Sequence, residues 1–268
     1  MHKCCKVVVT FFGARRRFDF YEDDTIELLK YAYENEKSID PGEGVSVDLV
    51  FVNNSFYNKD YHRGNAYLES LNGTSTKTGK IVVLPGDNIG MSFGGYNSAY
   101  QTLKDDYDYW LFCEDDLLFS EDEYYASMIK QINTDSSIGF ISPTGVGSAG
   151  TSKQHAHGSI GLTKKEYLQQ ACEINRGILP FWNEEMDDIK FNNISKQIEH
   201  GEIAFSNIHV KLGRKIVKSN HDIRPFVRWI KGDLENLDIK EWGSHGVVSD
   251  EQKISAGIST KKYPFSFK

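Results

Sequence analysis

Short apolar runs alternate along the chain with longer segments in which apolar residues recur at helical spacing. Runs that are apolar throughout are typical of strands buried on both faces of a parallel sheet. We interpret as strands the runs 6–12, 45–52, 81–84, 109–113, 138–141 and 214–218. We interpret as helices a segment from Asp24 or Thr25 to Glu36 and the segments 58–71, 92–103, 120–132, 163–175, 181–199 and 202–213. Because strands and helices alternate, the pattern predicts an α/β fold with right-handed crossovers.

Several predicted helices have recognisable ends. Ser120, followed by Glu123 three residues later, has the pattern of a capping box at a helix start. The pair 200–201 (His-Gly) is expected to end one helix, and Glu202 to begin the next. Gly213 fits the position after the last turn of that helix, where a left-handed backbone conformation favours glycine.

An acidic cluster follows the most apolar of the predicted strands. The run 109–113 (YWLFC) ends directly in Glu114, Asp115 and Asp116. Open α/β sheets bind their ligands outside the carboxyl ends of the strands. The cluster is therefore the first candidate for a ligand-binding or metal-binding site.

Composition and charge narrow the classes of partner. The 268 residues suffice for one large domain, and a net charge of −7 argues against a nucleic-acid-binding protein, which normally carries a basic face. No apolar run reaches the roughly 18 residues of a membrane-spanning helix. The four cysteines lack the spacing of a metal finger, so we interpret them as reduced thiols of a cytoplasmic protein.

Two polar segments allow more than one interpretation. The arginine run 15–17, just after the first strand, could bind a diphosphate through bidentate contacts or form a solvated turn. The segment 143–161 is rich in Gly, Ser and Thr, as expected of a long loop, and it lacks the spacing of a phosphate-binding loop. His155 and His157 in this segment could touch an acceptor or phosphates, but we expect them to be exposed.

The segment 87–119 resembles the nucleotide-sugar glycosyltransferases of the GT-A fold, especially those of the family-2 type. Their pattern is N-x-G, a small-residue helix with an internal Asn, an apolar strand and a D-x-D metal motif. The matching residues here are Asn88, Gly90, Gly94, Gly95, Asn97, 110–112 and 114–116. The first acid of the motif is Glu114 rather than Asp. The resemblance implies a GT-A (Rossmann-like) fold, with a mostly parallel central sheet flanked by helices.

The resemblance also implies which residues bind the nucleotide sugar and the metal. In the family the loop after the first strand touches the nucleotide, and an acid after the second strand binds the ribose or base; Asn53 replaces that acid here. The implied donor-binding residues are Thr10, Phe11, Phe12, Arg15, Asn53, Asn88, Gly90, Asn97, Glu114 and Asp115. The implied cofactor is Mn²⁺ or Mg²⁺, which prefer carboxylate and phosphate oxygens. Its implied ligands are Asp116, Glu114 and His221, with His245 as the alternative histidine.

A second match lies far along the chain. Inverting members of the family have an E-D pair, about ten residues later a Gly, and then a short strand. Gly201 and Glu202 occupy the places of the pair here, and Gly213 is followed by the strand residues 214–217. The resemblance therefore implies that Glu202 is the base that removes the proton of a hydroxyl acceptor. The alternative is an acid that only interacts favourably with the N-terminus of a helix.

Together these inferences predict one GT-A domain over residues 1–223, with a nucleotide-binding half (1–119) and an acceptor half (120–223). Residues 224–268 are an extension that we expect to pack on the same domain; whether it lies beside the sheet, forms an acceptor subsite or makes a homodimer contact is open.

The predicted function is that of an inverting, metal-dependent glycosyltransferase of the hexosyltransferase type. It would move a sugar from a nucleoside diphosphate sugar to a glycan or another hydroxyl acceptor. One alternative is a sugar nucleotidyltransferase, which would need a Gly-rich signature with Lys or Arg after the first strand; the sequence 12–16 (FGARR) resembles that signature poorly. The other is a non-catalytic carbohydrate-binding module of the same fold.

Overall fold

The computed structural model describes most of the chain up to residue 220 and three short strands beyond it. The described residues are 1–13, 22–115, 117–119, 121–143, 146–147, 155–156, 160–181, 198–220, 227–228, 240–243 and 246–247. All structural statements below concern these residues.

A seven-stranded, mostly parallel sheet forms the centre of the molecule, in the order β10-β6-β9-β4-β1-β2-β3. Its strands are β1 (His2–Thr10), β2 (Val45–Asn53), β3 (Ile81–Pro85), β4 (Tyr109–Glu114), β6 (Ile138–Ser142), β9 (Gly161–Lys164) and β10 (Lys215–Lys218). Strand β1 pairs in parallel with both β2 and β4, while β9 runs antiparallel to β4 and β6. The α/β fold class predicted from the sequence, Rossmann-like with a mostly parallel sheet, is confirmed.

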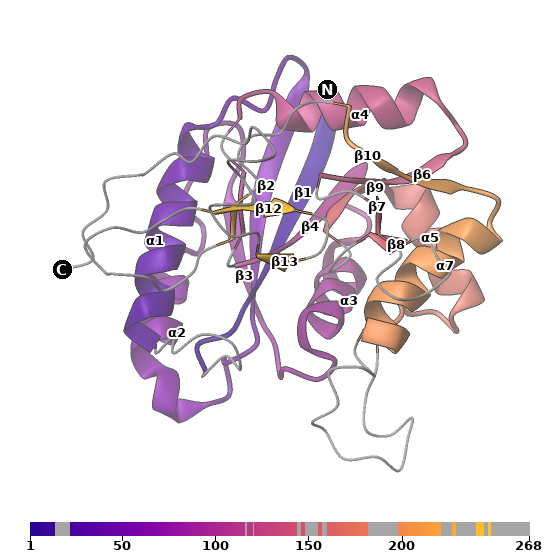
Figure 1. The fold of residues 1–268 in the computed structure, drawn as a ribbon. Coiled ribbons are helices and arrows are strands. Elements are labelled where there is room, and N and C mark those ends of the chain that lie inside the picture. Colours follow the sequence, from indigo (N-terminus) through magenta and orange to yellow (C-terminus); the bar gives the residue numbers. More distant parts are fainter. Residues whose placement is uncertain are drawn as a thin grey trace, which may run out of the picture.

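Helices cover both faces of this sheet (Figure 1). Buried residues of α1 (Glu22–Ser38), α2 (His62–Leu71) and α4 (Tyr124–Thr134) lie in one core. Those of α3 (Met91–Leu103) and α7 (Ala204–Lys211) and most of α5 (Lys165–Ile174) lie in the other, while Tyr167 of α5 belongs to the first. Strand β4 contributes Leu111 and Cys113 to the first core and Trp110 and Phe112 to the second. Both kinds of position must be apolar, which explains the continuous run in the sequence.

Short strands extend the fold at two places. A four-stranded sheet has the order β13-β12-β11-β5, from β5 (Leu117–Leu118), β11 (Val227–Arg228), β12 (Lys240–Gly243) and β13 (Gly246–Val247). The antiparallel pair of β5 with β11 brings residues 227–228 beside the strand that follows the acidic cluster. A separate hairpin joins β7 (Val146–Gly147) to β8 (His155–Ala156). The predicted domain boundaries stay predictions.

The first strand is displaced from its predicted place at 6–12. It begins at His2, because Cys4 and Cys5 are fully buried on opposite faces of the sheet and behave as small apolar residues. It ends at Thr10, because the backbone N–H of Phe12 donates to Ser55 Oγ at 2.9 Å. All four cysteines are buried and none forms a disulfide, which confirms the interpretation as thiols. None of the helices described has the length and apolar character that crossing a membrane requires.

The predicted starts of α1 and α4 are wrong. Helix α1 begins at Glu22, whose carboxylate accepts a hydrogen bond from the backbone of Gly64 in α2 at 2.8 Å, so Thr25 lies inside the helix. Helix α4 begins at Tyr124 and has no capping box: Glu123 has a left-handed backbone (φ 62°) and makes no side-chain cap bond. Its N–H donates instead to the carbonyl of Asp40 at 2.6 Å, so a tertiary contact replaces the local cap.

Two further elements differ from the expectation. The predicted helix 163–175 begins only at Lys165, because Gly161–Lys164 is the antiparallel strand β9 between β4 and β6. The predicted break at 200–201 is absent: a π-helical segment, η4 (Ile198–Ile203), runs directly into α7. Residues 182–197 lie outside the described part. The predicted helix over 58–71 is confirmed, as a 3₁₀ turn η1 (Lys59–Tyr61) followed by α2. The prediction for Gly213 is also confirmed, because its backbone is left-handed (φ 74°).

A buried ion pair links β1 to α1. Lys6 Nζ lies 2.5 Å from Glu36 Oε2, and both residues are buried. The hydroxyl groups of Tyr124 and Tyr125 donate to Glu36 Oε1, and Lys6 Nζ also lies 4.6 Å from the ring centre of Phe119. Because each carboxylate oxygen has donors, the cost of burying the charges is offset by hydrogen bonds as well as by their attraction.

A buried histidine is the least satisfied polar group of the second core. His209 on α7 is fully buried against the rings of Phe140 and Phe205, and in the described part of the chain neither ring nitrogen has a hydrogen-bond partner. Burial, with a smaller contribution from the charge of Arg214, lowers the pKa of His209 from 6.5 to about 3. The folded protein therefore holds this imidazole neutral.

We predict that His209 makes the fold sensitive to acid. The unfolded chain binds a proton at this residue below about pH 6.5 and the folded chain only below about pH 3, so its contribution to stability is complete above pH 6.5 and is lost as the pH falls towards 3. Between pH 7 and 5 the loss amounts to about 2 kcal/mol. Urea unfolding at both pH values should show a smaller loss for His209→Leu than for the wild type. An equal loss in both proteins would contradict the assignment.

Candidate functional site

The order of the strands reverses at β1. The chain builds β1, β2 and β3 outward in one direction and then returns to place β4 on the other side of β1. A crevice at the carboxyl ends of the strands beside such a switch point is where open α/β sheets bind ligands. Strand β1 ends at Thr10 and β4 at Glu114, so the acidic cluster lies at this point.

The first two acids of the cluster make different contacts. Glu114 Oε1 accepts a hydrogen bond from Ser92 Oγ on α3 at 2.6 Å. Asp115 is buried, and its Oδ2 accepts from the backbone N–H of Phe11 at 3.2 Å. One carboxylate thus contacts helix α3 and the other the segment after β1. Asp116 lies outside the described residues.

The end of β2 holds the segment after β1 in place. Asn53 is fully buried; its Nδ2 donates to Asn65 Oδ1 at 2.7 Å and its Oδ1 accepts from the N–H of Ser55 at 3.0 Å. Ser55 Oγ in turn accepts from the N–H of Phe12. Of the residues predicted to touch the nucleotide here, Thr10, Phe12 and Asn53 are buried and Phe11 is partly exposed. Arg15 lies outside the described residues.

The N-x-G segment (88–90) packs closely against the first turn of helix α3. Asn54 Nδ2 donates to Asn88 Oδ1 at 3.2 Å and to the carbonyl of Met91 at 3.1 Å. Gly90 precedes α3 with a left-handed backbone (φ 75°). A Cβ at Gly94 would lie 1.7 Å from the carbonyl oxygen of Ile89, so only glycine fits there. These contacts place the first turn of α3 beside Glu114.

Asn97 holds a different segment. Its Oδ1 accepts from the backbone N–H of Leu179 at 2.9 Å, which ties α3 to the residues after α5. The structure therefore gives Asn97 a contact within the protein, away from the loop at 86–91.

Glu202 lies in the π-helical segment η4 and is buried, with 6% of its surface exposed. His155 Nε2 on β8 lies 3.0 Å from Glu202 Oε1, and only 1% of His155 is exposed. The expectation that His155 is exposed is wrong, because the β7–β8 hairpin packs its histidine against η4. His157 lies outside the described residues.

The glycine before Glu202 packs closely on helix α3. A Cβ at Gly201 would lie 2.3 Å from the ring of Phe93 on α3. Phe93 follows Ser92, which donates to Glu114. The helix that carries Glu202 therefore packs on α3 next to the acidic cluster. The contact also explains why position 201 holds no acid: a larger side chain would collide with Phe93.

The residues expected to hold a metal are only partly described. The described residues contain no group of three or more His, Cys, Asp and Glu suited to a metal ion. Two of the three implied ligands, Asp116 and His221, and the alternative His245 lie outside them. Consecutive carboxylates at the end of a strand are the oxygen donors that Mg²⁺ and Mn²⁺ prefer, so the donor chemistry fits such an ion.

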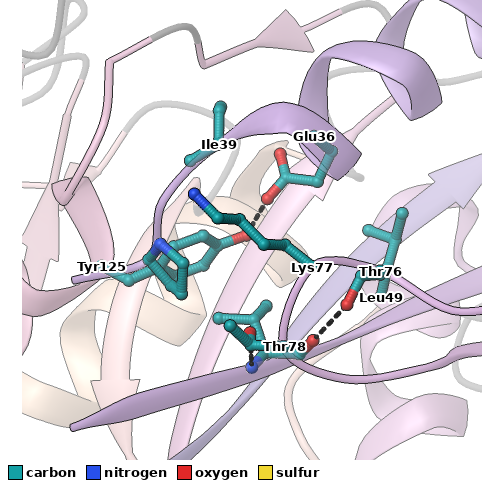
Figure 2. Close-up of a pocket in the computed structure, with 9 residues that line it drawn as sticks. Glu36, Ile39, Leu49, Thr76, Lys77, Thr78 and Tyr125 are labelled. Atoms are coloured by element: carbon teal, nitrogen blue, oxygen red, sulfur yellow. Dashed lines mark hydrogen bonds between the residues drawn. The ribbon is translucent and has the colours of Figure 1, made fainter. Parts of the chain in front are cut away.

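A pocket at another place has a different character (Figure 2). It is a small hollow with a cavity volume of about 10 Å³, and it is lined by Glu36, Ile39, Pro41, Val47, Leu49, Thr76, Lys77, Thr78 and Tyr125. Glu36 and Tyr125 are joined by a hydrogen bond there. Val47 lies near the beginning of β2, so the pocket is away from the carboxyl ends of the strands, and it contains none of the predicted site residues.

Three contact residues of the candidate site, Ser92, Asn54 and Ser55, were not singled out from the sequence, and His155 was singled out there but expected to be exposed. Each is a common polar residue in a segment that reads as a turn, loop or helix surface, and the contact it makes is with a segment distant along the chain. Their roles follow only from the fold.

Comparison with known proteins gives neighbours in solved structures alone. No family model matches the chain, and no curated protein matches it. One similar structure is described as CMP:2-keto-3-deoxy-manno-octonic acid synthetase complexed with CTP, with 10% identity over 81% of this chain and 88% of that chain and a TM-score of 0.44. A cytidylyltransferase from Leptospira borgpetersenii has 12% identity over 85% and 82%, with a TM-score of 0.45. The 4-diphosphocytidyl-2C-methyl-D-erythritol synthase from Anaerococcus prevotii has 13% identity over 83% and 91%, with a TM-score of 0.40. None of these three descriptions names a glycosyltransferase.

We predict that Gly94→Ala destabilises the protein. In an ordinary helix this change stabilises by roughly 0.5–1 kcal/mol, but here the new Cβ would meet the carbonyl oxygen of Ile89. We expect the free energy of unfolding in urea to fall by roughly 1–3 kcal/mol. Ser98→Ala, one turn further along α3, is the matched control and should change it by less than about 0.5 kcal/mol. A more stable Gly94→Ala variant would show that the helix start can move without cost.

Proposed function

We propose that this chain is a transferase that binds a nucleoside diphosphate sugar at the carboxyl ends of β1 and β4 and moves the sugar to a hydroxyl acceptor. The observation that supports the proposal is the contact of Gly201 with Phe93, because the neighbouring residue of α3, Ser92, donates a hydrogen bond to Glu114 of the acidic cluster. A strand-end carboxylate cluster and the helix of a separate acid, from distant parts of the chain, thus both contact helix α3. Glu202 also lies in a π-helical segment, a rare geometry that is frequent at functional sites.

The acidic cluster suits the donor half of the reaction. A departing nucleoside diphosphate carries negative charge, and a bound Mg²⁺ or Mn²⁺ would neutralise it. Glu114 and Asp116 are the residues proposed to hold that ion, while Asp115 keeps the segment after β1 in position through the N–H of Phe11. The first turn of α3 lies next to Glu114 through Ser92, and backbone N–H groups at a helix start favour phosphate oxygens.

Glu202 suits the acceptor half. A sugar hydroxyl has a very high pKa, so it attacks well only while its proton is being removed. In the proposed step this proton passes to the Glu202 carboxylate as the hydroxyl oxygen forms a bond to the anomeric carbon. The bond from that carbon to the diphosphate oxygen breaks, and its electron pair leaves with the nucleoside diphosphate. Attack opposite to the leaving group inverts the anomeric centre.

Sugar nucleotidyl transfer is the second candidate. The observation in its favour is the arginine run 15–17, which follows the end of β1 by five residues in the sequence and has the guanidinium groups that bind phosphate oxygens of a nucleoside triphosphate. In this reaction a phosphate oxygen of a sugar phosphate attacks the α-phosphorus, and diphosphate leaves. Such a nucleophile is already ionised at neutral pH and needs no base. The two candidates therefore differ in their need for Glu202.

We predict that the protein releases nucleoside diphosphate from at least one nucleoside diphosphate sugar in the presence of Mn²⁺. The measurement is a panel of donors, with and without a sugar acceptor, followed by chromatography of the nucleotides. A parallel panel of nucleoside triphosphates with sugar phosphates or sugar acids should release no inorganic diphosphate. Release of diphosphate instead would establish the second candidate, and binding of sugars without any turnover would indicate a non-catalytic module.

We predict that Glu202→Gln lowers kcat by about 100-fold or more, because general-base catalysis contributes on this order. The amide keeps the size of the side chain, so the affinity for the donor should stay close to that of the wild type. Asp116→Asn should instead weaken metal-dependent binding of the donor, measured by calorimetry. Wild-type turnover by Glu202→Gln would exclude this residue as the base.

A further inference from the structure

Two consecutive residues of the β7–β8 hairpin bind one face of the helix that carries Glu202. His155 Nε2 lies 3.0 Å from Glu202 Oε1, and the backbone N–H of Ala156 donates to Ser206 Oγ at 3.1 Å. Glu202 and Ser206 are four residues apart, so they lie on the same side of this helix. The hairpin therefore fixes the helix at two points, and one of them is the proposed base.

The contact between His155 and Glu202 is buried and polar. Only 1% of His155 and 6% of Glu202 is exposed. Burying such a pair costs desolvation that its attraction barely offsets, so it contributes little to the stability of the fold. A short hydrogen bond in a buried place does, however, restrict the rotamers of the carboxylate.

We propose that His155 is a positioning residue for Glu202, an inference that rests on the proposed function. Its Nε2–H donates to Glu202 Oε1 and holds the carboxylate in one orientation towards the acceptor. A hydrogen bond to the ionised carboxylate also favours the form that accepts a proton. His155 thus acts through Glu202 and touches neither the donor nor the acceptor.

The helices packed against this pair carry other titratable groups. On η4 His200 is exposed, and on α7 His209 is buried and neutral while Lys211 is exposed. On α3, which packs on η4 through Phe93, the nearest titratable side chain along the helix is the buried Tyr96. Each of these groups is unchanged in the variants below, so a difference between the variants reports on His155.

The hairpin offers a matched control for a purely structural role. Ser206→Ala removes the second contact between hairpin and helix and leaves the bond to Glu202 in place. If His155 only ties the hairpin down, its replacement should act as Ser206→Ala does and lower the melting temperature without affecting kcat. If it positions the base, its replacement should lower kcat as well.

The test measures kcat, KM and the melting temperature for the wild type, His155→Leu, His155→Gln, Ser206→Ala and Glu202→Gln, with the donor that the wild type turns over. His155→Leu should lower kcat on the order of 100-fold, the effect of a misplaced catalytic group, with the KM of the donor little changed. The acidic limb of its kcat–pH profile should move to higher pH. His155→Gln keeps an N–H donor of similar reach and should retain kcat within about tenfold of the wild type. Ser206→Ala should retain both kcat and the pH profile.

The outcomes separate the two proposals. An inactive Glu202→Gln variant together with wild-type kcat and pH profile in His155→Leu overturns the positioning role and leaves the proposed function standing. Turnover by Glu202→Gln, or no turnover by the wild type, overturns both. If His155→Leu does not fold, a loss of kcat in His155→Gln as large as in Glu202→Gln, at an unchanged melting temperature, overturns the role of the N–H donor.

Discussion

The parallel pairing of β1 with strands on both of its sides is the constraint on which the rest of the structure depends. The register sets Thr10 opposite Asn53 on β2 and Val9 opposite Glu114 on β4. The carboxyl ends of three strands that are distant in sequence therefore lie side by side. The hydrogen bond from the N–H of Phe11 to Asp115 links the residues that follow β1 to those that follow β4. Parallel strands need crossovers, so the helices that cover the two faces are a consequence of the same pairing.

The sequence correctly predicted strands that are buried on both faces of the sheet, because such strands are apolar at every position. The run 109–113 reads as a strand because its residues alternate between two apolar cores. The prediction from sequence failed where contacts with distant segments determine the secondary structure. Nothing local marks Gly161–Lys164 as a strand, yet β4 and β6 bind it from both sides, and a Cβ at Gly161 would lie 2.2 Å from the carbonyl oxygen of Ile141. Glu123 similarly takes a left-handed backbone because Asp40 accepts its N–H.

For the candidate site the sequence indicated which segments take part, but it did not indicate which side chains contact one another. It singled out the end of β4 and the segment around Glu202, and the fold packs the helices beside them together through Gly201 and Phe93. It could not show that Asn53 would turn inward to Asn65, or that His155 would be buried, because both facts depend on partners far along the chain. The roles of Asp116, Arg15 and His221 stay predictions from the sequence.

Among the described residues two acid–base pairs have both partners buried, and the partners of the two carboxylates differ. Glu36 accepts from the ammonium group of Lys6 and from two tyrosine hydroxyls, so both of its oxygens are bound within the core. The bond that Glu202 receives from His155 comes from an imidazole, which can donate an N–H while it is neutral. A neutral donor orients a carboxylate and lowers its basicity less than a full positive charge does. A base must keep enough proton affinity to take a hydroxyl proton in the transition state, and a neutral imidazole donor would orient Glu202 without removing that affinity.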